Sequence, residues 1–309
     1  MEFKHFSVML NECIEGLDIK PNGIYIDGTL GGAGHSIEIV KKLTTGKLIS
    51  FDKDTTAIEF STNKLKDYDD KVTLIHNDFK QFDIELNNLS IEKVDGILLD
   101  LGISSYQIDT GERGFSYMQD APLDMRMDTT KGKTAWNIVN EYSQEDLVEV
   151  FSKYGEEPYS KRIADAIVRS RLGSPIDTTL QLVKIIERSV PSKNVKSGHP
   201  AKRVFQALRI EVNGELDELY DCIIKMARRL NKGGRFCIMT FHSLEDKIVK
   251  TAFNYLASDC VCDKKLPICI CNHKREVKLI NKKPITATEE ELKENSRSHS
   301  AKLRIIEKL

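Results

Sequence analysis

The sequence has neither a long apolar run nor an excess of positive charge. Its strings of strongly apolar side chains, such as Ile97-Leu98-Leu99, fall far short of the roughly 20 residues that a membrane-spanning helix needs. The segment Met1–His5 lacks the apolar stretch of a secretory signal. With 46 basic and 47 acidic residues, the net charge is −1. That balance excludes a histone-like binder that relies on a global positive field.

What the 309 residues do contain is typical of a globular protein. Apolar side chains make up 40% and charged side chains 30% of the chain, which argues against a mostly disordered protein. The seven cysteines are an odd number, and no export signal accompanies them. We therefore expect reduced thiols and a cytoplasmic protein.

Strand-like and helix-like patterns alternate through the first hundred residues. Short apolar runs that predict strands are separated by segments with apolar residues at helical spacing. The expected strands cover 23–28, 47–52, 72–78 and 94–100, and the expected helices cover 33–44 and 55–66. This alternation predicts βαβ units and a parallel sheet.

The alternation stops after residue 100 and returns only near residue 200. Residues 102–132 have no sustained period, and 134–190 are helical only, with capping patterns at Ser143–Asp146 and Thr178–Gln181. A polar linker is expected at 193–200 and a helix at 201–230, ended by Gly233-Gly234. Further strands are expected at 235–241, 278–285 and 301–309. The sequence thus predicts an α/β core interrupted by a helical insertion.

A glycine-rich loop, Asp27–His35, lies between the first expected strand and the first expected helix. In open α/β sheets, ligands bind outside the carboxyl ends of the strands, where glycine lets the backbone come close to them. An ordinary tight turn is the alternative, because a glycine-rich turn alone is a weak signal.

Acidic residues at the ends of the strands strengthen the ligand-site interpretation. Asp27, Asp52, Asp78 and Asp100 each end one of the first four strands, although Asp also begins turns well. A carboxylate placed like Asp52 accepts hydrogen bonds from both hydroxyls of a ribose. Phe79, next to Asp78, is suited to hold an adenine. We expect a nucleoside site.

The cofactor is not expected to carry phosphate. Gly32-x-Gly34 would need a third glycine at position 37 to bind a dinucleotide, and that residue is Ile37. Crowded carboxylates also repel a pyrophosphate. S-adenosylmethionine suits the site better, because its sulfonium and ammonium groups can face Asp27 or Asp100.

Long motifs in this order resemble the MraW (RsmH) family of ribosomal RNA small-subunit cytosine-N4 methyltransferases. The resemblance runs from end to end of the chain. It is carried by the segments 5–10, 27–35, 95–105, 111–116, 123–128, 199–209, 241–246 and 300–304.

The resemblance implies a Rossmann-like class I S-adenosylmethionine-dependent methyltransferase core with an inserted helical domain. We expect residues 1–108 and 201–309 to form the core and 109–200 to recognise the substrate. The implied reaction transfers a methyl group to the exocyclic N4 of a cytidine in the decoding region of 16S ribosomal RNA. The implied partner is that RNA, in an assembled or nearly assembled small subunit, with no membrane involved. The sequence leaves a homodimer open.

The resemblance also implies which residues contact the cofactor. They are Ala33, Gly34, His35, Asp52, Phe79, Asp100 and Gln107. One departure lies next to Gln107, because this chain has Tyr106 where the family usually has proline.

Asp100 is also the first candidate to accept a hydrogen bond from the reacting amine, although a role in cofactor binding alone is about equally well supported. Six further side chains are candidates for contacting RNA: Ser104, Ser105, Arg113, Phe115, Arg126 and His242. Each also has a purely structural alternative. The serines could begin a turn, the arginines could form salt bridges, the aromatic ring could pack against the core, and the histidine could make a structural hydrogen bond.

Positive charge is local, which suits contacts with RNA phosphates, although short charge runs are usually just solvated. Basic residues gather between 264 and 283 and between 193 and 209. At the start of the first of these segments and just before it, Cys260-x-Cys262 and Cys269-x-Cys271 form a compact quartet with His273 beside it. Four thiolates can hold zinc, but Cys-x-Cys is tighter than the usual spacing. The sequence alone assigns no metal.

Two other classes remain as alternatives. A nicotinamide oxidoreductase could share the architecture, but Ile37 argues against it. A non-catalytic RNA-binding or zinc-stabilised assembly factor is the other, and the intact loop with Asp52 argues against that.

Overall fold

The computed structural model describes residues 7–104, 107, 110–191, 199–263, 266 and 268–309. They form two compact units: residues up to 102 together with 216–309, and residues 103–215. The sequence-based boundaries, with 109–200 as the insertion, remain a prediction. Among the described residues, no helix is long and apolar enough to cross a membrane.

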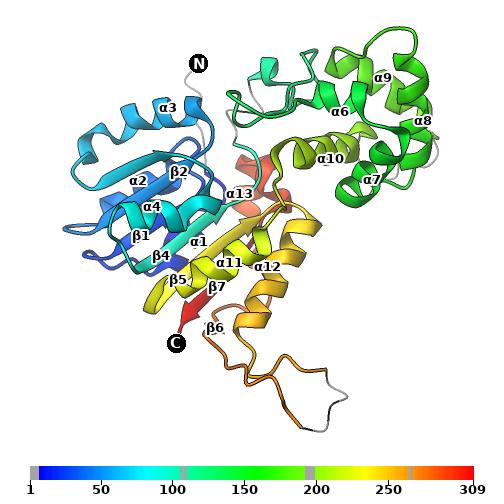
Figure 1. The fold of residues 1–309 in the computed structure, drawn as a ribbon. Coiled ribbons are helices and arrows are strands. Elements are labelled where there is room, and N and C mark those ends of the chain that lie inside the picture. Colours follow the sequence, from blue (N-terminus) through cyan, green and yellow to red (C-terminus); the bar gives the residue numbers. More distant parts are fainter. Residues whose placement is uncertain (1–6, 105–106, 108–109, 192–198, 264–265, 267) are drawn as a thin grey trace. The chain divides into compact units, whose positions relative to one another are not determined.

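The first unit is built on one seven-stranded sheet in the order β3-β2-β1-β4-β5-β7-β6 (Figure 1). The first five strands in that order are parallel, and β7 and β6 are added in antiparallel fashion. The strand bounds are β1 Ile24–Asp27, β2 Lys47–Asp52, β3 Val72–His76, β4 Val94–Asp100, β5 Leu230–Thr240, β6 Val277–Leu279 and β7 Lys302–Lys308. The predicted α/β class with a parallel sheet is confirmed.

Helices cover both faces of this sheet. Successive strand residues point to opposite faces, so Ile97 and Leu99 pack on one side with helices α4, α11 and α12, while Leu98 packs on the other with α1, α2 and α3. The bounds are α1 Leu10–Leu17, α2 Gly34–Lys41, α3 Thr55–Leu65, α4 Phe82–Asn88, α11 Leu219–Arg228, α12 Ser243–Leu256 and α13 Glu289–Glu294. Both faces are apolar, which is why the central strands read as continuous apolar runs.

The second unit is helical. Its helices are α6 Ala135–Glu141, α7 Gln144–Gly155, α8 Ser160–Arg171, α9 Thr179–Ser189 and α10 Ala201–Asn213. The predicted capping boxes are confirmed: Ser143 caps α7 against Asp146, and Thr178 caps α9 against Gln181. Each pair satisfies backbone N–H groups that a helix start leaves free.

The structure corrects the single helix predicted over 201–230. Gly214 ends α10 in the left-handed region, with φ of 56°, and α11 begins only at Leu219. Gly233 and Gly234, expected to end that helix, lie inside β5, where the register with β4 is irregular. A strand tolerates a glycine at such a bulge, so these glycines do not mark a helix end.

Candidate cofactor site at the carboxyl edge of the sheet

The loop between β1 and α2 is tied to the two strands beside β1. The amide of Gly28 donates to the carbonyl of Leu98 in β4, and the amide of Leu30 donates to the carbonyl of Phe51 in β2, both at 2.9 Å. These bonds hold the loop over the carboxyl ends of the parallel strands, which is where open α/β sheets bind ligands.

Two glycines of this loop leave no room for a side chain. A Cβ on Gly28 would lie 2.3 Å from Leu99 Cδ2 and 3.1 Å from Phe79 Cβ. A Cβ on Gly34 would lie 1.8 Å from Ser7 Oγ. Between them, Ala33 takes a left-handed conformation, with φ of 60°, to start α2. Close packing therefore favours glycine at position 28, and a side chain at position 34 would have to displace Ser7.

Asp52, at the end of β2, holds the far side of the loop. Its Oδ2 accepts a 2.8 Å hydrogen bond from the amide of Gly31, and its Oδ1 accepts a 2.9 Å bond from the amide of Asp54. Burial raises the pKa of Asp52 to about 6. Each oxygen keeps a lone pair for a ligand hydroxyl.

Asp100, at the end of β4, has an unsatisfied oxygen. Its Oδ1 is buried and has no hydrogen-bond partner among the described residues, whereas its Oδ2 lies 3.9 Å from Nδ1 of His35. Burial, with Asp27 next in importance, raises the pKa of Asp100 well above its usual range. A cation or an N–H donor beside Oδ1 would offset the cost of burying this carboxylate.

Asp27 is engaged inside the protein. It is 1% exposed; its Oδ2 accepts a 2.7 Å hydrogen bond from the hydroxyl of Ser36, and its Oδ1 accepts a 3.1 Å bond from the amide of Thr29. Of the two carboxylates considered for a cationic ligand, only Asp100 keeps an unpaired oxygen in the described structure.

The other cofactor residues named by the resemblance fall into two groups. His35 is buried, with Nε2 3.2 Å from the carbonyl of Val8, and Phe79 lies at the loop beside Gly28. Gln107 belongs to the second unit, where it exchanges hydrogen bonds with Ser104. The structure thus brings Ala33, Gly34, His35, Asp52, Phe79 and Asp100 together at one edge of the sheet.

The RNA-contact candidates have structural partners. Arg126 makes a double hydrogen bond to Asp124, at 2.8 and 2.9 Å, and Arg113 donates to the carbonyls of Arg126 and Met127. Phe115 is buried at 8% exposure. Arg126 thus has the salt bridge, and Phe115 the packing, that the structural alternatives describe, whereas the two hydrogen bonds named for Arg113 go to backbone carbonyls and not to a carboxylate.

His242 is the N-cap of α12. Its Nδ1 accepts from the amide of Glu245, whose carboxylate accepts in return from the amide of His242. Ser104 pairs with Gln107. Ser105 and Tyr106 lie outside the described residues.

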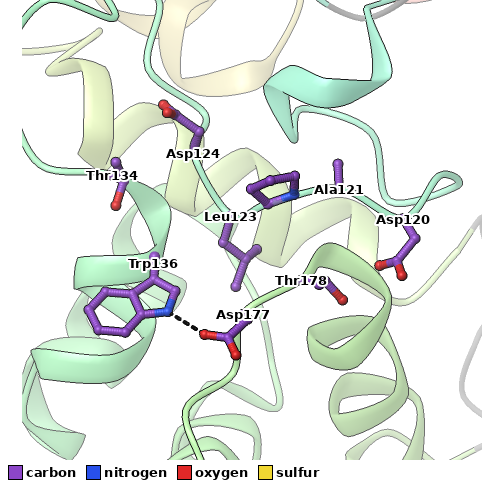
Figure 2. A pocket seen from close by; sticks show the side chains of 9 residues that line it. Asp120, Ala121, Leu123, Asp124, Thr134, Trp136, Asp177 and Thr178 are labelled. Atoms are coloured by element: carbon purple, nitrogen blue, oxygen red, sulfur yellow. Dashed lines mark hydrogen bonds between the residues drawn. The ribbon is translucent and has the colours of Figure 1, made fainter.

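A pocket of about 550 Å³ opens on the second unit (Figure 2). Trp136 lies on its wall and donates a 2.9 Å hydrogen bond from Nε1 to Asp177. Asp120 and Asp124 also line it. Three carboxylates around one pocket disfavour a phosphate ligand.

Several contacts in the first unit cannot be predicted from the spacing of residues along the sequence. Thr29 gives no signal in the sequence, yet its hydroxyl accepts a 2.7 Å hydrogen bond from the amide of Asp100. Arg304, at the end of the segment 300–304, pairs with Asp246 at 2.7 and 3.1 Å and ties β7 to α12. Only the three-dimensional fold brings such pairs together.

Comparison with known proteins agrees with this geometry. The model of the MraW methylase family matches residues 2–309. Ribosomal RNA small subunit methyltransferase H of Clostridioides difficile (strain 630) is 52% identical over 311 residues, and its counterpart in Clostridium botulinum (strain Loch Maree / Type A3) is 53% identical over 310, with 100% of each chain covered in both cases.

A solved rRNA methylase from Streptococcus thermophilus is far less similar. It has a TM-score of 0.40 and 12% identity, with 97% of this chain and 93% of that chain covered. The family match and the full-length relatives are decisive. The chain therefore belongs to the MraW methylase family, as its motifs predict, and is a methyltransferase that depends on S-adenosylmethionine.

Proposed function

We propose that S-adenosylmethionine binds over the loop 28–34, at the carboxyl ends of β1, β2 and β4. The observation that carries this placement is the buried Oδ1 of Asp100 at that edge, which has no hydrogen-bond partner in the described part of the chain. A ligand with a positive charge or an N–H donor satisfies that oxygen, and S-adenosylmethionine has both. When bound, this cofactor supplies an activated methyl group on a sulfonium.

The remaining residues of this edge fit the rest of that molecule. Asp52 has a lone pair on each oxygen for the two ribose hydroxyls. Phe79 offers an aromatic face next to Gly28 for the adenine. Ala33, Gly34 and His35 form the start of α2, and the positive end of the helix dipole there favours acceptor groups. Gln107 is included on the resemblance alone.

The proposed substrate is a cytidine of small-subunit (16S) ribosomal RNA in the decoding region, methylated on its exocyclic N4. The relatives are named small-subunit RNA methyltransferases, and the resemblance supplies the atom and the region. The exocyclic amine is a poor nucleophile, because its lone pair is delocalised into the pyrimidine ring.

In this proposal Asp100 acts on the amine. Accepting a hydrogen bond from an N–H favours the form in which the nitrogen lone pair is available, and the negative carboxylate stabilises positive charge that develops on nitrogen. The nitrogen forms a bond to the methyl carbon as the carbon–sulfur bond breaks. The methylated amine then releases a proton to solvent, so no strong base is required. The hydrogen bond from Asp100 to Thr29 fixes the end of β4 for this task.

RNA recognition is assigned to the helical insertion, residues 109–200. A cytosine amine is reached only in an unstacked base, as single-stranded or loop RNA offers. Ser104, Arg113, Phe115, Arg126 and His242 stay candidates for contacts with that RNA. Their internal hydrogen bonds would have to open or be shared for this to occur. Ser105 is proposed on sequence alone.

The fully assembled or nearly assembled small subunit is the proposed substrate form, in the cytoplasm, where the free thiols of this chain persist. The test uses small subunits and protein-free small-subunit RNA from cells that lack the enzyme, each incubated with the protein and S-adenosylmethionine. Mass spectrometry of the digested nucleosides should show N4-methylcytidine from subunits and much less from free RNA. Absence of this nucleoside from both samples would overturn the proposal.

A further inference from the structure

Four of the seven cysteines gather in one segment between α12 and β6. Figure 1 shows this segment, in orange, leaving α12 and returning to the sheet at β6. In its described part, residues 257–263, 266 and 268–276, no helix or strand forms. Cys260, Cys262, Cys269 and Cys271 lie there as free thiols, whereas the other three cysteines are buried in the core.

The four sulfur atoms lie at the distances that one metal ion requires. All four Sγ atoms are within 4.8 Å of one another. Cys269 Sγ is 3.6 Å from Cys271 Sγ, which is 3.9 Å from Cys260 Sγ. Four sulfurs placed tetrahedrally at about 2.3 Å from zinc are about 3.8 Å apart. A disulfide would bring two of them to about 2.05 Å, so these distances match shared coordination instead.

Backbone amides support the sulfurs in a reciprocal pattern. The amide of Val261, between the first two cysteines, donates to Cys271 Sγ at 3.4 Å. The amide of Ile270, between the last two, donates to Cys262 Sγ at 3.4 Å. Hydrogen bonds to sulfur favour the thiolate, which is the form that binds metal. Each short Cys-x-Cys turn thus supports the other.

Apolar packing cannot hold this segment together. Val261 is 44% exposed, Ile268 75% and Ile270 72%. The described residues of this segment include no helix, strand or buried apolar side chain, so little offsets the entropy of ordering them. Small units of this kind usually need a disulfide or a metal.

His273 is not needed as a ligand. Its Nε2 lies 2.9 Å from the carbonyl oxygen of Tyr255, and its ring lies against that of Tyr255, with centroids 4.6 Å apart. The four sulfurs already complete a tetrahedral set. A site with all four positions filled by protein leaves none for water or substrate, which is the mark of a structural site.

We propose that Cys260, Cys262, Cys269 and Cys271 bind one Zn²⁺ ion that holds the two stretches 260–262 and 269–271 together. Binding converts the four thiols to thiolates and releases their protons to solvent. The ion takes no part in methyl transfer.

The test measures metal in the full-length protein, purified without chelator and supplied with Zn²⁺. We expect about one equivalent of zinc per chain, and less than about a tenth after all four cysteines are replaced by serine. Co²⁺ in place of zinc should give the intense absorption of tetrahedral thiolate coordination. The His273→Ala control should keep the full equivalent, since it tests the neighbouring side chain without removing a sulfur.

Less than about a tenth of an equivalent in the wild type, with no cobalt absorption, would overturn the proposal. The proposal would also be overturned if the four cysteines proved to form disulfides, which would protect them from alkylation in the denatured protein. We expect the variant without the four cysteines to fold, because the segment lies outside both apolar cores of the first unit. Circular dichroism checks this. Removal of zinc should also speed cleavage of the segment by trypsin at least tenfold. None of these measurements depends on methyltransferase activity.

Discussion

The amide of Asp100 donates a 2.7 Å hydrogen bond to the hydroxyl of Thr29, which joins the end of β4 to the glycine-rich loop. The side chain of Thr29 thereby joins the proposed acceptor to the proposed cofactor loop, in addition to the backbone bond from Gly28 to Leu98. Thr29 is a positioning residue in this account, because it acts through Asp100.

Replacing Thr29 by valine removes the acceptor at nearly constant volume. One such hydrogen bond is worth about 1 kcal/mol, so we expect kcat to fall about five- to tenfold. Affinity for S-adenosylmethionine should change less. The Thr29→Ser variant keeps the hydroxyl and should retain most of the activity. Equal losses of affinity and kcat in Thr29→Val would contradict the positioning role.

Asp100→Asn should keep the fold and lose methyl transfer. The substitution preserves shape but removes the negative charge that stabilises the reacting amine, and we expect a loss of about 10²- to 10³-fold in kcat. Single-turnover transfer at saturating cofactor is the measurement. Calorimetric binding of S-adenosylmethionine to the same variant separates the two roles of this residue. Full turnover would remove Asp100 from both.

Asp52→Ala should weaken cofactor binding by roughly 2–3 kcal/mol, because it removes the proposed acceptors for the ribose and the observed acceptor for the amide of Gly31. Asp69→Ala is the matched control: Asp69 is exposed and lies outside the glycine-rich loop, so this variant should bind the cofactor normally. Isothermal titration calorimetry compares the two. An unchanged affinity in Asp52→Ala would rule out the ribose contact.

The pH dependence of binding follows from the same carboxyl group. Burial raises the pKa of Asp52 to about 6. Hydroxyl donors prefer the ionised carboxylate, so affinity should rise as pH increases through about 6 and level off above it, with proton release on binding in that range. In Asp52→Asn this dependence should disappear. An affinity that stays constant from acid to neutral pH in the wild type would contradict the assignment.

Gly28→Ala should disturb the loop and the adenine side of the site together. Its Cβ would lie 2.3 Å from Leu99 Cδ2 and 3.1 Å from Phe79 Cβ, so one of these side chains must move. Overpacking of this kind costs about 1–3 kcal/mol of stability. Gly173→Ala, where the nearest atom is 3.8 Å away, is the control and should melt like the wild type. Identical thermal unfolding and cofactor affinity for both variants would contradict the close-packing argument.

Arg304→Met should destabilise the first unit. Arg304 holds the pKa of Asp246 below its usual range through two hydrogen bonds, and both side chains are largely buried. The substitution leaves Asp246 its longer contact with Lys302, at 3.5 Å, and should cost about 2 kcal/mol in free energy of unfolding, measured by denaturant titration. Because a lowered pKa adds stability that is lost as pH falls, the loss should be largest near neutral pH. The double variant with Asp246→Leu should recover much of it, and a single variant as stable as the wild type would exclude this role.

Much of the first unit could be predicted from the sequence, because parallel strands buried on both faces form continuous apolar runs that end in Asp or Gly. The expected strand ending at Asp52 matches β2, and that ending at Asp100 matches β4. Family membership also decides against the oxidoreductase and the non-catalytic alternatives. The break at Gly214 was missed because an amphipathic pattern continues across it.

The hydrogen-bond partners of charged side chains are harder to predict from the sequence. Asp27 and Asp100 look equivalent in the sequence, since each ends a strand. Only the structure shows that Ser36 satisfies Asp27, while Oδ1 of Asp100 has no partner in the part of the chain described. Arg126 likewise gives no sign in the sequence of whether it prefers RNA or Asp124. The partner of such a charged side chain depends on the folded structure, and the local sequence pattern does not show it.

The position of the methyl donor tests the central claim most directly. A crystal structure of the protein grown with S-adenosylmethionine should show the ribose hydroxyls on Asp52, the adenine at Phe79 and a cationic or N–H group on Oδ1 of Asp100. A donor bound away from the loop 28–34, with that oxygen still unpaired, would contradict the account.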